Sequence, residues 1–243
     1  MEAIRIENLT KRYRDVLAVD SLSLTVYEGE LFSLLGVNGA GKTTTIKMLS
    51  CLTAPTAGDA YLLGNSICTD APAVKATIAV SPQETAVAGG LSVKENLELM
   101  CGVHGFPREE HSVRIGEIAG LLGLENVLQR RAGKLSGGWQ RRLSIAMALI
   151  SQPKILFLDE PTLGLDVLAR AELWDLIRSL KGKITIILTT HYMEEAEALS
   201  DRIAIMKDGR LIACDSADAL KSMAGADRFE DAFIRIVRGE ASL

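Results

Sequence analysis

Apolar and polar residues follow two different periods along this chain, and together they predict its secondary structure. Short segments in which apolar residues alternate with polar ones, or form an unbroken run, are typical of β-strands. They lie at residues 3–9, 22–26, 31–35, 60–63, 78–80, 155–158, 184–189, 202–207 and 211–214. Apolar residues spaced three and four positions apart predict amphipathic helices. These lie at residues 44–49, 93–103, 108–122, 138–151, 167–180, 192–199, 215–223 and 229–237.

The order of these elements predicts an α/β protein that carries a helical insertion. Residues 93–151 contain helices alone, and strands and helices are mixed on either side of them. Ser92 and Glu95 form the pattern of a capping box at the start of the first inserted helix. Asp208 and Gly209 stand between two strands and are a hairpin signal.

The composition is that of a folded protein. Apolar residues make up 48% and charged residues 24% of the 243 residues, unlike the composition of disordered chains. The net charge of −4 gives no electrostatic reason to expect nucleic acid as a main partner. The four cysteines lack the paired spacing of a metal site and are expected to be reduced thiols of a cytoplasmic protein. We expect no signal peptide and no membrane-spanning helix, because no stretch approaches about 18 apolar residues.

Residues 36–44 carry the clearest chemical motif. Their sequence, Gly-Val-Asn-Gly-Ala-Gly-Lys-Thr-Thr, places Gly36, Gly41, Lys42 and Thr43 at the spacing of a phosphate-binding loop. The glycines let the backbone turn several N–H groups toward a phosphate. Lys42 is expected to reach the β- and γ-phosphates, and the Thr43 hydroxyl to bind Mg²⁺. The strand before this loop and the helix after it are the context in which such a loop binds a nucleotide.

Two carboxylates follow the apolar run at residues 155–158. Asp159 is placed to hold Mg²⁺ directly or through water. Glu160 is placed to polarise a water molecule for attack on the γ-phosphate. The alternative, two solvated carboxylates at a strand end, is disfavoured by the deeply apolar strand before them.

A second phosphate-binding element precedes the helix at residues 138–151. Leu135-Ser136-Gly137-Gly138 combines a hydroxyl with two glycine N–H groups at a helix N-terminus, which favours an anion. Either each chain binds two nucleotides, or one nucleotide is held between two chains.

Two further polar residues are ambiguous from their local sequence. Tyr13, within Lys11-Arg12-Tyr13-Arg14, either stacks on a nucleotide base or packs against a loop. Gln83 follows Pro82 and either contacts a metal or a water molecule or is simply solvated.

In their order along the chain, these motifs resemble those of the ATP-binding cassette (ABC) ATPases of membrane transporters. The resemblance covers nearly the whole chain. It depends on the phosphate loop, Gln83, Ser136-Gly137-Gly138, the strand that ends in Asp159-Glu160, Gly164-Leu165-Asp166 and His191. The stretch from Thr189 to Glu197 is similar to the ABC-2 type branch, which exports drugs, sodium, lipids or polysaccharides through a separate permease.

The resemblance implies the fold and its divisions. We expect an α/β fold with a P-loop NTPase (RecA-like) core, an antiparallel β subdomain and an inserted α-helical subdomain. Residues 1–243 then form a single ABC ATPase domain. The core and β subdomain occupy 1–87 and 153–220, the helical subdomain about 88–152, and a C-terminal helical tail 221–243.

The resemblance also implies a role for each matching residue. Tyr13 stacks on the base, Gln83 touches Mg²⁺ and senses the membrane partner, Glu160 is the general base, and His191 contacts the γ-phosphate. Ser136 and Gly138 contact the ATP of the opposite subunit, and Asp166 communicates across the dimer. Residues implied in catalysis are Glu160, His191, Gln83 and Lys42. Those implied in binding ATP are Tyr13, Gly36, Asn38, Gly39, Ala40, Gly41, Lys42, Thr43, Thr44, Ser136, Gly137, Gly138 and Asp166. Those implied at Mg²⁺ are Thr43, Gln83 and Asp159.

Two positions depart from the family pattern. Trp139 follows Ser-Gly-Gly where a glutamine is usual, and its bulk is expected to alter the contact with the opposite subunit. Gly164-Leu165-Asp166 keeps only Leu-Asp of the commoner Ser-Ala-Leu-Asp, which removes a serine from this loop.

The implied function is a cytoplasmic ATPase subunit, peripheral at the inner face of the cell membrane. It dimerises around two ATP–Mg²⁺ sites and powers export through a transmembrane permease, which docks near residues 91–122. A soluble ABC ATPase of DNA repair would carry a long coiled coil, and one of translation would carry two cassettes. A small-molecule kinase leaves Ser136-Gly137-Gly138 unexplained, and a regulatory module without turnover is disfavoured by Glu160 and His191.

Overall fold

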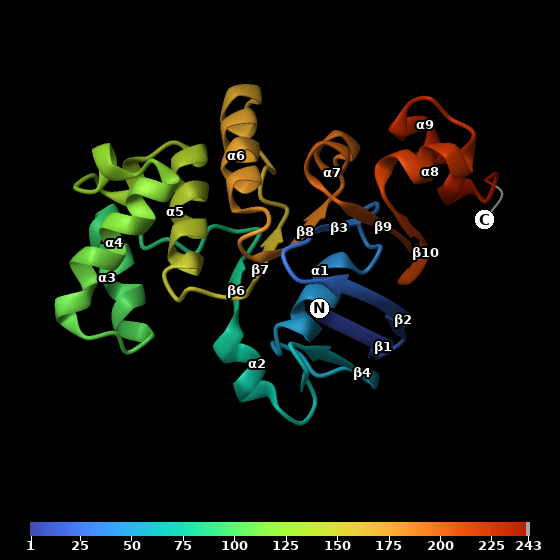
Figure 1. Cartoon of the computed structure of the whole chain (residues 1–243), viewed down its shortest axis with the longest axis horizontal. Helices are drawn as coiled ribbons and strands as arrows, with labels where there is room; N and C mark the ends of the chain where they lie inside the picture. The colour runs from blue at the N-terminus through green and yellow to red at the C-terminus, as the bar shows by residue number, and fades with distance from the viewer. Residues whose placement is uncertain (242–243) are drawn as a thin grey trace.

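Figure 1 shows a computed structural model of the chain, which describes residues 1–241. Its strands are β1 (Glu2–Tyr13), β2 (Val16–Tyr27), β3 (Leu31–Leu35), β4 (Ala57–Leu62), β5 (Asn65–Ser66), β6 (Ile78–Ser81), β7 (Ile155–Asp159), β8 (Thr185–Thr190), β9 (Arg202–Lys207) and β10 (Arg210–Asp215). Its α-helices are α1 (Lys42–Leu49), α2 (Ala71–Thr77), α3 (Val93–Val103), α4 (Arg108–Leu122), α5 (Gly137–Leu149), α6 (Val167–Leu180), α7 (Met193–Leu199), α8 (Ala217–Ala224) and α9 (Phe229–Arg238).

A six-stranded sheet forms the centre, in the order β10-β9-β3-β8-β7-β6. Neighbouring strands from β9 to β6 are parallel, and β10 pairs antiparallel with β9. Every residue of β3, β7 and β8 is buried, which explains why these strands appear in the sequence as unbroken apolar runs. Because these strands are parallel, the loops after β3, β6, β7 and β8 emerge at one edge of the sheet.

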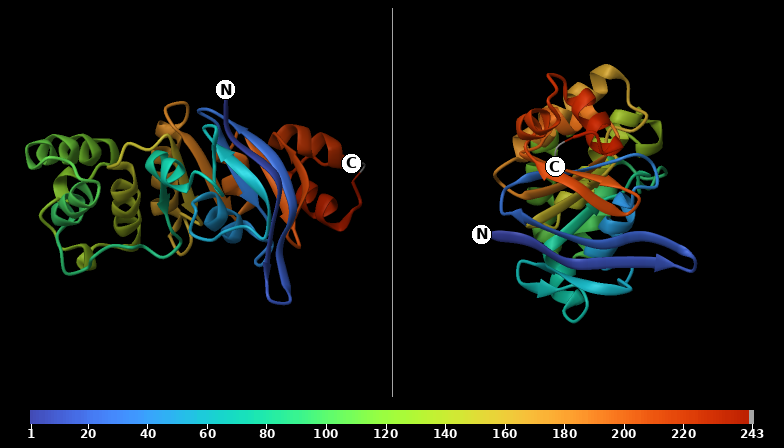
Figure 2. Two further views of the ribbon diagram at one scale, coloured as in Figure 1. Left: turned by 90° about the horizontal axis from the view of Figure 1, so that it is seen from below. Right: turned by 90° about the vertical axis from the view of Figure 1, so that its right-hand side faces the viewer.

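A second sheet, in the order β2-β1-β4-β5, is antiparallel and lies on one side of the first (Figure 2). Helix α1 lies between the two sheets (Figure 1), and Ile46, Met48 and Leu49 join Phe32 and Phe157 in one buried apolar cluster. The phosphate-loop helix is therefore held by core packing on both sides. The expectation of an α/β fold with a phosphate-loop core and an antiparallel β part is confirmed.

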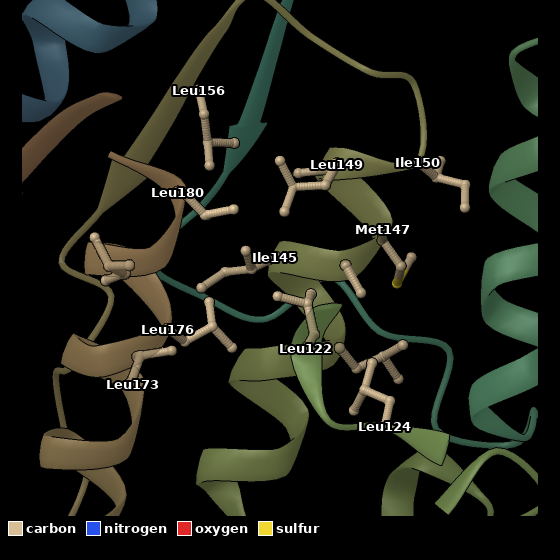
Figure 3. Close-up of a cluster of buried hydrophobic side chains, with 14 of the residues drawn as sticks. Leu122, Leu124, Ile145, Met147, Leu149, Ile150, Leu156, Leu173, Leu176 and Leu180 are labelled. Carbon is tan, nitrogen blue, oxygen red and sulfur yellow. The ribbon is translucent and has the colours of Figure 1, made fainter. Parts of the chain in front are cut away.

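The other face of the central sheet is covered by α5, α6 and α7. Figure 3 shows apolar side chains of α5 and α6 meeting Leu156 of β7. The side chains labelled there are Leu122, Leu124, Ile145, Met147, Leu149, Ile150, Leu156, Leu173, Leu176 and Leu180. Helices α3 and α4 lie beyond α5 at one end of the molecule, and α8 and α9 lie at the other (Figure 1).

Several local predictions are confirmed. The side chain of Ser92 accepts from Glu95 N at 3.2 Å, and Oε2 of Glu95 accepts from Ser92 N at 2.7 Å, which completes the capping box. Asp208 and Gly209 both have positive φ, 50° and 80°, and form the tight turn between β9 and β10. All four cysteines are free thiols. Among residues 1–241, no helix is both long enough and apolar enough to span a bilayer.

The amino-terminal hairpin corrects one prediction. The strands predicted at 3–9 and 22–26 are each 12 residues long, and Lys11 to Tyr13 belong to the end of β1 rather than to a connecting segment. Tyr13 pairs with Val16 across the turn. Beyond Thr10 the strand pairs only with β2 and is largely exposed, so burial imposes no alternation of apolar and polar residues there.

Helix α2 was not predicted from the sequence. It is seven residues long, contains Pro72 in its first turn and buries only Val74, so it has no apolar stripe to detect. Predicted helices also differ from the observed ones by one or two residues at some ends: α1 begins at Lys42 rather than Thr44, and α8 spans Ala217–Ala224 rather than 215–223.

Candidate nucleotide-binding and catalytic site

A cleft of about 640 Å³ opens at the edge of the central sheet where the parallel strands end. Of the residues predicted for the site, it is lined by Asn38, Gly39, Ala40, Gly41, Lys42, Thr43, Thr44, Gln83, Glu160 and His191. It is also lined by Val16, Leu17, Ala18, Leu163 and Asp208, none of which the sequence analysis assigned to the site. Segments that are more than a hundred residues apart in sequence therefore meet in one cavity.

The loop between β3 and α1 needs glycine at three points. A Cβ on Gly36 would lie 2.5 Å from the carbonyl oxygen of Met206. Gly41 has φ +100°, and a Cβ there would lie 2.5 Å from the carbonyl oxygen of Ala18. Gly39 has φ +85° but open space around it. Gly39 and Gly41 both take a backbone conformation that costs L-residues free energy, so these glycines permit the tight loop that lines the cleft.

Lys42 is the first residue of α1, and its side chain is only 6% exposed. Its Nζ donates to the carbonyl of Gly36 at 2.6 Å and lies 3.6 Å from Oε1 of Glu160. Burial lowers the pKa of Lys42, and the neighbouring carboxylate of Glu160 acts in the opposite direction. Gly36 does not line the cleft but anchors this lysine.

Thr43, Asp159 and Thr189 join three neighbouring elements of the site. The hydroxyl of Thr43 donates to Oδ1 of Asp159 at 3.2 Å, and Thr189 Oγ1 donates to the same oxygen at 2.5 Å. The backbone N–H of Glu160 points at both the carbonyl and the hydroxyl of Thr189, each at 3.1 Å. Thr189 thus fixes the end of β7 against β8, a role that its place in an apolar strand gave no reason to predict.

Glu160 lies between a lysine and a histidine. Its Oε1 faces Lys42, and its Oε2 lies 2.7 Å from Nδ1 of His191. Its backbone has φ +49°, a left-handed conformation that is costly for a residue with a side chain. The residue is 6% exposed, so its carboxylate is held in the cleft with few alternative positions.

Gln83 lies in the cleft at the loop after β6, and a buried arginine of α5 holds this loop. Arg141 is 4% exposed and donates to the carbonyl of Pro82 at 2.6 Å and to the carbonyl of Gln83. Burial lowers the pKa of Arg141, while Asp159 and Glu195 raise it. Arg141 is a residue that the sequence analysis missed, because a charged residue is not expected at a core position of a helix.

Ser136, Gly137 and Gly138 do not line the cleft. Ser136 is exposed at the N-cap of α5 and makes no side-chain capping bond, so the first N–H groups of this helix have no side-chain partner there. Asp166 caps the next helix, α6, by accepting from Ala169 N at 2.9 Å. The two segments are neighbours, because a Cβ on Gly138 would lie 3.1 Å from the Cβ of Ala169.

Trp139, three residues after Ser136, is partly buried. Its indole packs against the apolar cluster of α5 and α6, and the guanidinium of Arg142 lies 5.1 Å from the ring centroid. The neighbouring Gln140 donates to the carbonyls of Ala132 and Leu135, both at 3.2 Å. The bulk of Trp139 is thus partly accommodated inside its own chain.

Tyr13 lies at the tip of the β1–β2 hairpin and does not line the cleft. It is 44% exposed, with the ammonium of Lys11 4.9 Å from its ring centroid. Its cross-strand partner Val16 does line the cleft. Tyr13 is therefore one cross-strand pair away from the cleft lining, and its stacking on a base stays a prediction.

The site is that of a nucleotide-binding ATPase of the phosphate-loop class. It combines the glycine loop, the buried Lys42, the Thr43–Asp159 pair and the carboxylate of Glu160. Comparison with known proteins narrows this class. The family model described as ABC transporter matches residues 19–163. The chain therefore belongs to the ABC transporter family, and it is the ATP-binding cassette of that family, the ATPase.

Curated relatives agree with this family. The chain is 42% identical over 229 residues to the daunorubicin resistance ATP-binding protein DrrA3 of Streptomyces coeruleorubidus, covering 94% of this chain and 72% of that protein. It is 43% identical over 230 residues to the Nod factor export ATP-binding protein I of Burkholderia lata, covering 93% and 75%. It is 42% identical over 227 residues to the human phospholipid-transporting ATPase ABCA3, covering 92% of this chain but only 13% of that much longer protein.

Solved structures agree with the fold. The ATP-binding subunit of an ABC transporter matches with a TM-score of 0.84 and 26% identity, over 96% of this chain and 99% of that one. A bacterial ABC transporter cassette solved as a dimer matches with a TM-score of 0.78 and 28% identity, over 88% and 98%.

Proposed function

We propose that the cleft hydrolyses ATP with Glu160 as the general base. The observation that carries the proposal is that Lys42 and His191 contact opposite oxygens of this one buried carboxylate, at 3.6 and 2.7 Å. Each oxygen retains a lone pair that can accept a proton from an attacking water. Because the carboxylate is clamped on both sides, the water it binds is held in one orientation.

The other side chains of the cleft fit the phosphates of ATP. Loop N–H groups from Asn38 to Thr43 and the ammonium of Lys42 supply positive partial and full charges where negative charge develops. Nδ1 of His191 contacts Glu160, which leaves Nε2 to donate to a γ-phosphate oxygen when that nitrogen carries a proton. Tyr13, one cross-strand pair away from the cleft lining, supplies a face for the adenine base.

Magnesium fits the oxygen donors beside the cleft. Thr43 lines the cleft, and behind it Asp159, which is not among the lining residues, accepts a hydrogen bond from Thr43. The hydroxyl of Thr43 and Oδ1 of Asp159 lie 3.2 Å apart, and Gln83 lines the same cavity. Mg²⁺ prefers oxygen ligands and takes only one or two from protein, the rest from phosphates and water. When bound, it neutralises charge on the phosphate oxygens, and Thr189 keeps Asp159 oriented toward it.

The exposed Ser136 segment completes the site of a second copy of the chain. It lies outside the cleft of its own chain, and its helix N-terminus has no side-chain cap. Such a helix end binds a phosphate well, so each ATP is held between the loop of one chain and the Ser136 segment of its partner. A dimeric cassette among the similar structures supports this arrangement.

The ATPase powers export through a separate membrane permease; the name of the Nod factor export ATP-binding protein I supports export. The dock for the permease is the helical region of α3 and α4, where Leu99 and Val103 are 49% and 68% exposed, near the loop of Gln83. The chain is then peripheral at the inner face of the membrane. Cross-linking from α3 to a co-expressed permease tests this; cross-links that never form would contradict it. The alternative function, an ABC ATPase outside transport, would need no permease.

Mixing two inactive variants tests the shared site. Lys42→Ala disables the loop and Ser136→Arg blocks the trans contact, and each variant alone should be inactive. A mixed dimer has one site built from an intact loop and an intact Ser136. Mixing equal amounts should therefore restore about a quarter of the native rate, because half of the dimers are mixed and each has one intact site of two. No recovery on mixing, with both variants folded, would contradict a site shared between chains.

A further inference from the structure

A buried carboxylate of α7 has no role in the chemistry proposed above. Glu195 is 0% exposed, and its Oε1 accepts from the indole Nε1 of Trp174 at 3.1 Å. Among residues 1–241, its Oε2 has no hydrogen-bond partner, nor does the buried hydroxyl of Thr162 beside it. Burying a carboxyl group with one oxygen unpartnered costs free energy. A carboxyl group at this position therefore indicates a role that an apolar residue could not fill.

Three segments of the catalytic site converge on this carboxyl group. Thr162 lies two residues beyond Glu160, with its hydroxyl next to Glu195. Thr190 immediately precedes His191; its hydroxyl also faces Glu195 and accepts from Tyr192 N at 2.9 Å. Trp174 belongs to α6, the helix that Asp166 caps.

The charged groups around Glu195 come from two other elements. Glu160, after β7, and Arg141, on α5, both interact with its charge. Burial raises the pKa of Glu195, the hydroxyls of Thr190 and Thr162 and the indole of Trp174 oppose this, and the charge of Glu160 raises the pKa further. The hydroxyl of Thr162 and Oε2 of Glu195 lie next to each other and neither has another partner in the described part of the chain, so each can serve the other as donor or acceptor.

We propose that Glu195 is a positioning residue for ATP hydrolysis. Its carboxyl group ties the segment after Glu160 to the segment before His191 and to α6. Through Thr190 it fixes the backbone that presents His191, and through Thr162 the backbone that presents Glu160. The inference rests on the proposed roles of Glu160 and His191, and it concerns only the orientation of those residues.

Three variants of Glu195 and its neighbours test the proposal through the separate values of kcat and KM for ATP. Glu195→Ala should lower kcat about tenfold or more, because small misplacements of catalytic groups are costly, while KM changes little because the phosphate loop is untouched. Glu195→Gln keeps an acceptor for Trp174 and a donor for Thr162, so it should retain kcat within about threefold. Thr162→Val keeps the shape of the side chain but removes the hydroxyl, and it should lower kcat in the same direction as Glu195→Ala.

Glu194→Ala is the matched control, because Glu194 is the adjacent and exposed glutamate of the same helix. It should leave kcat and KM unchanged. Thr162→Val keeps the test valid if Glu195→Ala does not fold. A native kcat in folded Glu195→Ala or in Thr162→Val, or a Glu195→Gln variant as slow as Glu195→Ala, would overturn the proposal. Glu160→Gln is assayed in parallel: if it hydrolyses ATP normally, the proposed base is wrong, which is a failure distinct from that of Glu195.

Discussion

Replacing Arg141 by methionine tests whether α5 holds the loop of Gln83. The guanidinium makes two hydrogen bonds to backbone carbonyls, one of 2.6 Å to Pro82 and one to Gln83, and it is 4% exposed. Hydrogen bonds to charged groups contribute about 1.5–3 kcal/mol each. Methionine keeps most of the apolar stem of the side chain, so the change removes the two bonds with little loss of packing.

The net loss should be smaller than the sum of the two bonds. Burying the guanidinium itself costs free energy, as its lowered pKa indicates, and its bonds to both carbonyls are only part-buried. We therefore expect the free energy of unfolding to fall by about 2 kcal/mol. For a chain of this size, that lowers the melting temperature by about 4–8 °C.

Thermal unfolding followed by circular dichroism measures this change. Arg228→Met is the control, because the side chain of Arg228 is 71% exposed and its single ion pair with Glu230 should contribute less than about 1 kcal/mol. Arg141→Lys should fall between the native chain and Arg141→Met, since an ammonium group cannot reproduce the forked geometry. If Arg141→Met has the melting temperature of the native chain, or if the melting temperature of Arg228→Met falls by as much, the loop is not held by Arg141.

Three further results are expected from the geometry of the site. Gly41→Ala places a Cβ 2.5 Å from the carbonyl of Ala18 at φ +100° and should abolish ATP binding measured by calorimetry, whereas Gly39→Ala meets open space and should only weaken it. Lys42→Ala removes a charge-assisted contact to phosphate and should weaken ATP binding about 10- to 100-fold, and an unchanged Kd would contradict the assigned contact. The raised pKa of Glu195 means that the folded chain binds this proton more tightly than the unfolded chain, so the stability it contributes is lost as pH rises above its ordinary value of 4.5. The melting temperature of Glu195→Gln should therefore rise relative to that of the native chain as pH is raised. A difference in melting temperature that stays constant with pH would show that the pKa of this carboxyl group does not change on folding.

Local signals in the sequence were sufficient for the phosphate loop and its flanks. The apolar run at 31–35, the glycines and Lys42 are adjacent in sequence, so a strand, loop and helix could be predicted without knowing the rest of the fold. The start of α1 was misplaced by two residues because Lys42, though polar, is buried at the first helical position. The pattern of apolar residues cannot reveal that a charged residue such as this lysine is buried.

The contacts that build the site across the sheet could not be predicted from local patterns. The approach of Glu160 to His191, and of Thr189 to Asp159, depends on β8 lying beside β7 in the sheet. Strand order is set by long-range packing and leaves no periodicity in the sequence. The role of Arg141 could not be predicted for the same reason, because its hydrogen-bond partners lie 58 and 59 residues away along the chain.

The central claim is that Glu160 activates the attacking water in a site closed by two chains. Glu160→Gln keeps the size of the side chain and its place between Lys42 and His191 but removes the base. ATP turnover should fall about 10²- to 10⁴-fold, and the variant should still bind ATP and run as an ATP-dependent dimer by light scattering. Turnover near the native rate, or ATP binding without a dimer, would contradict this account.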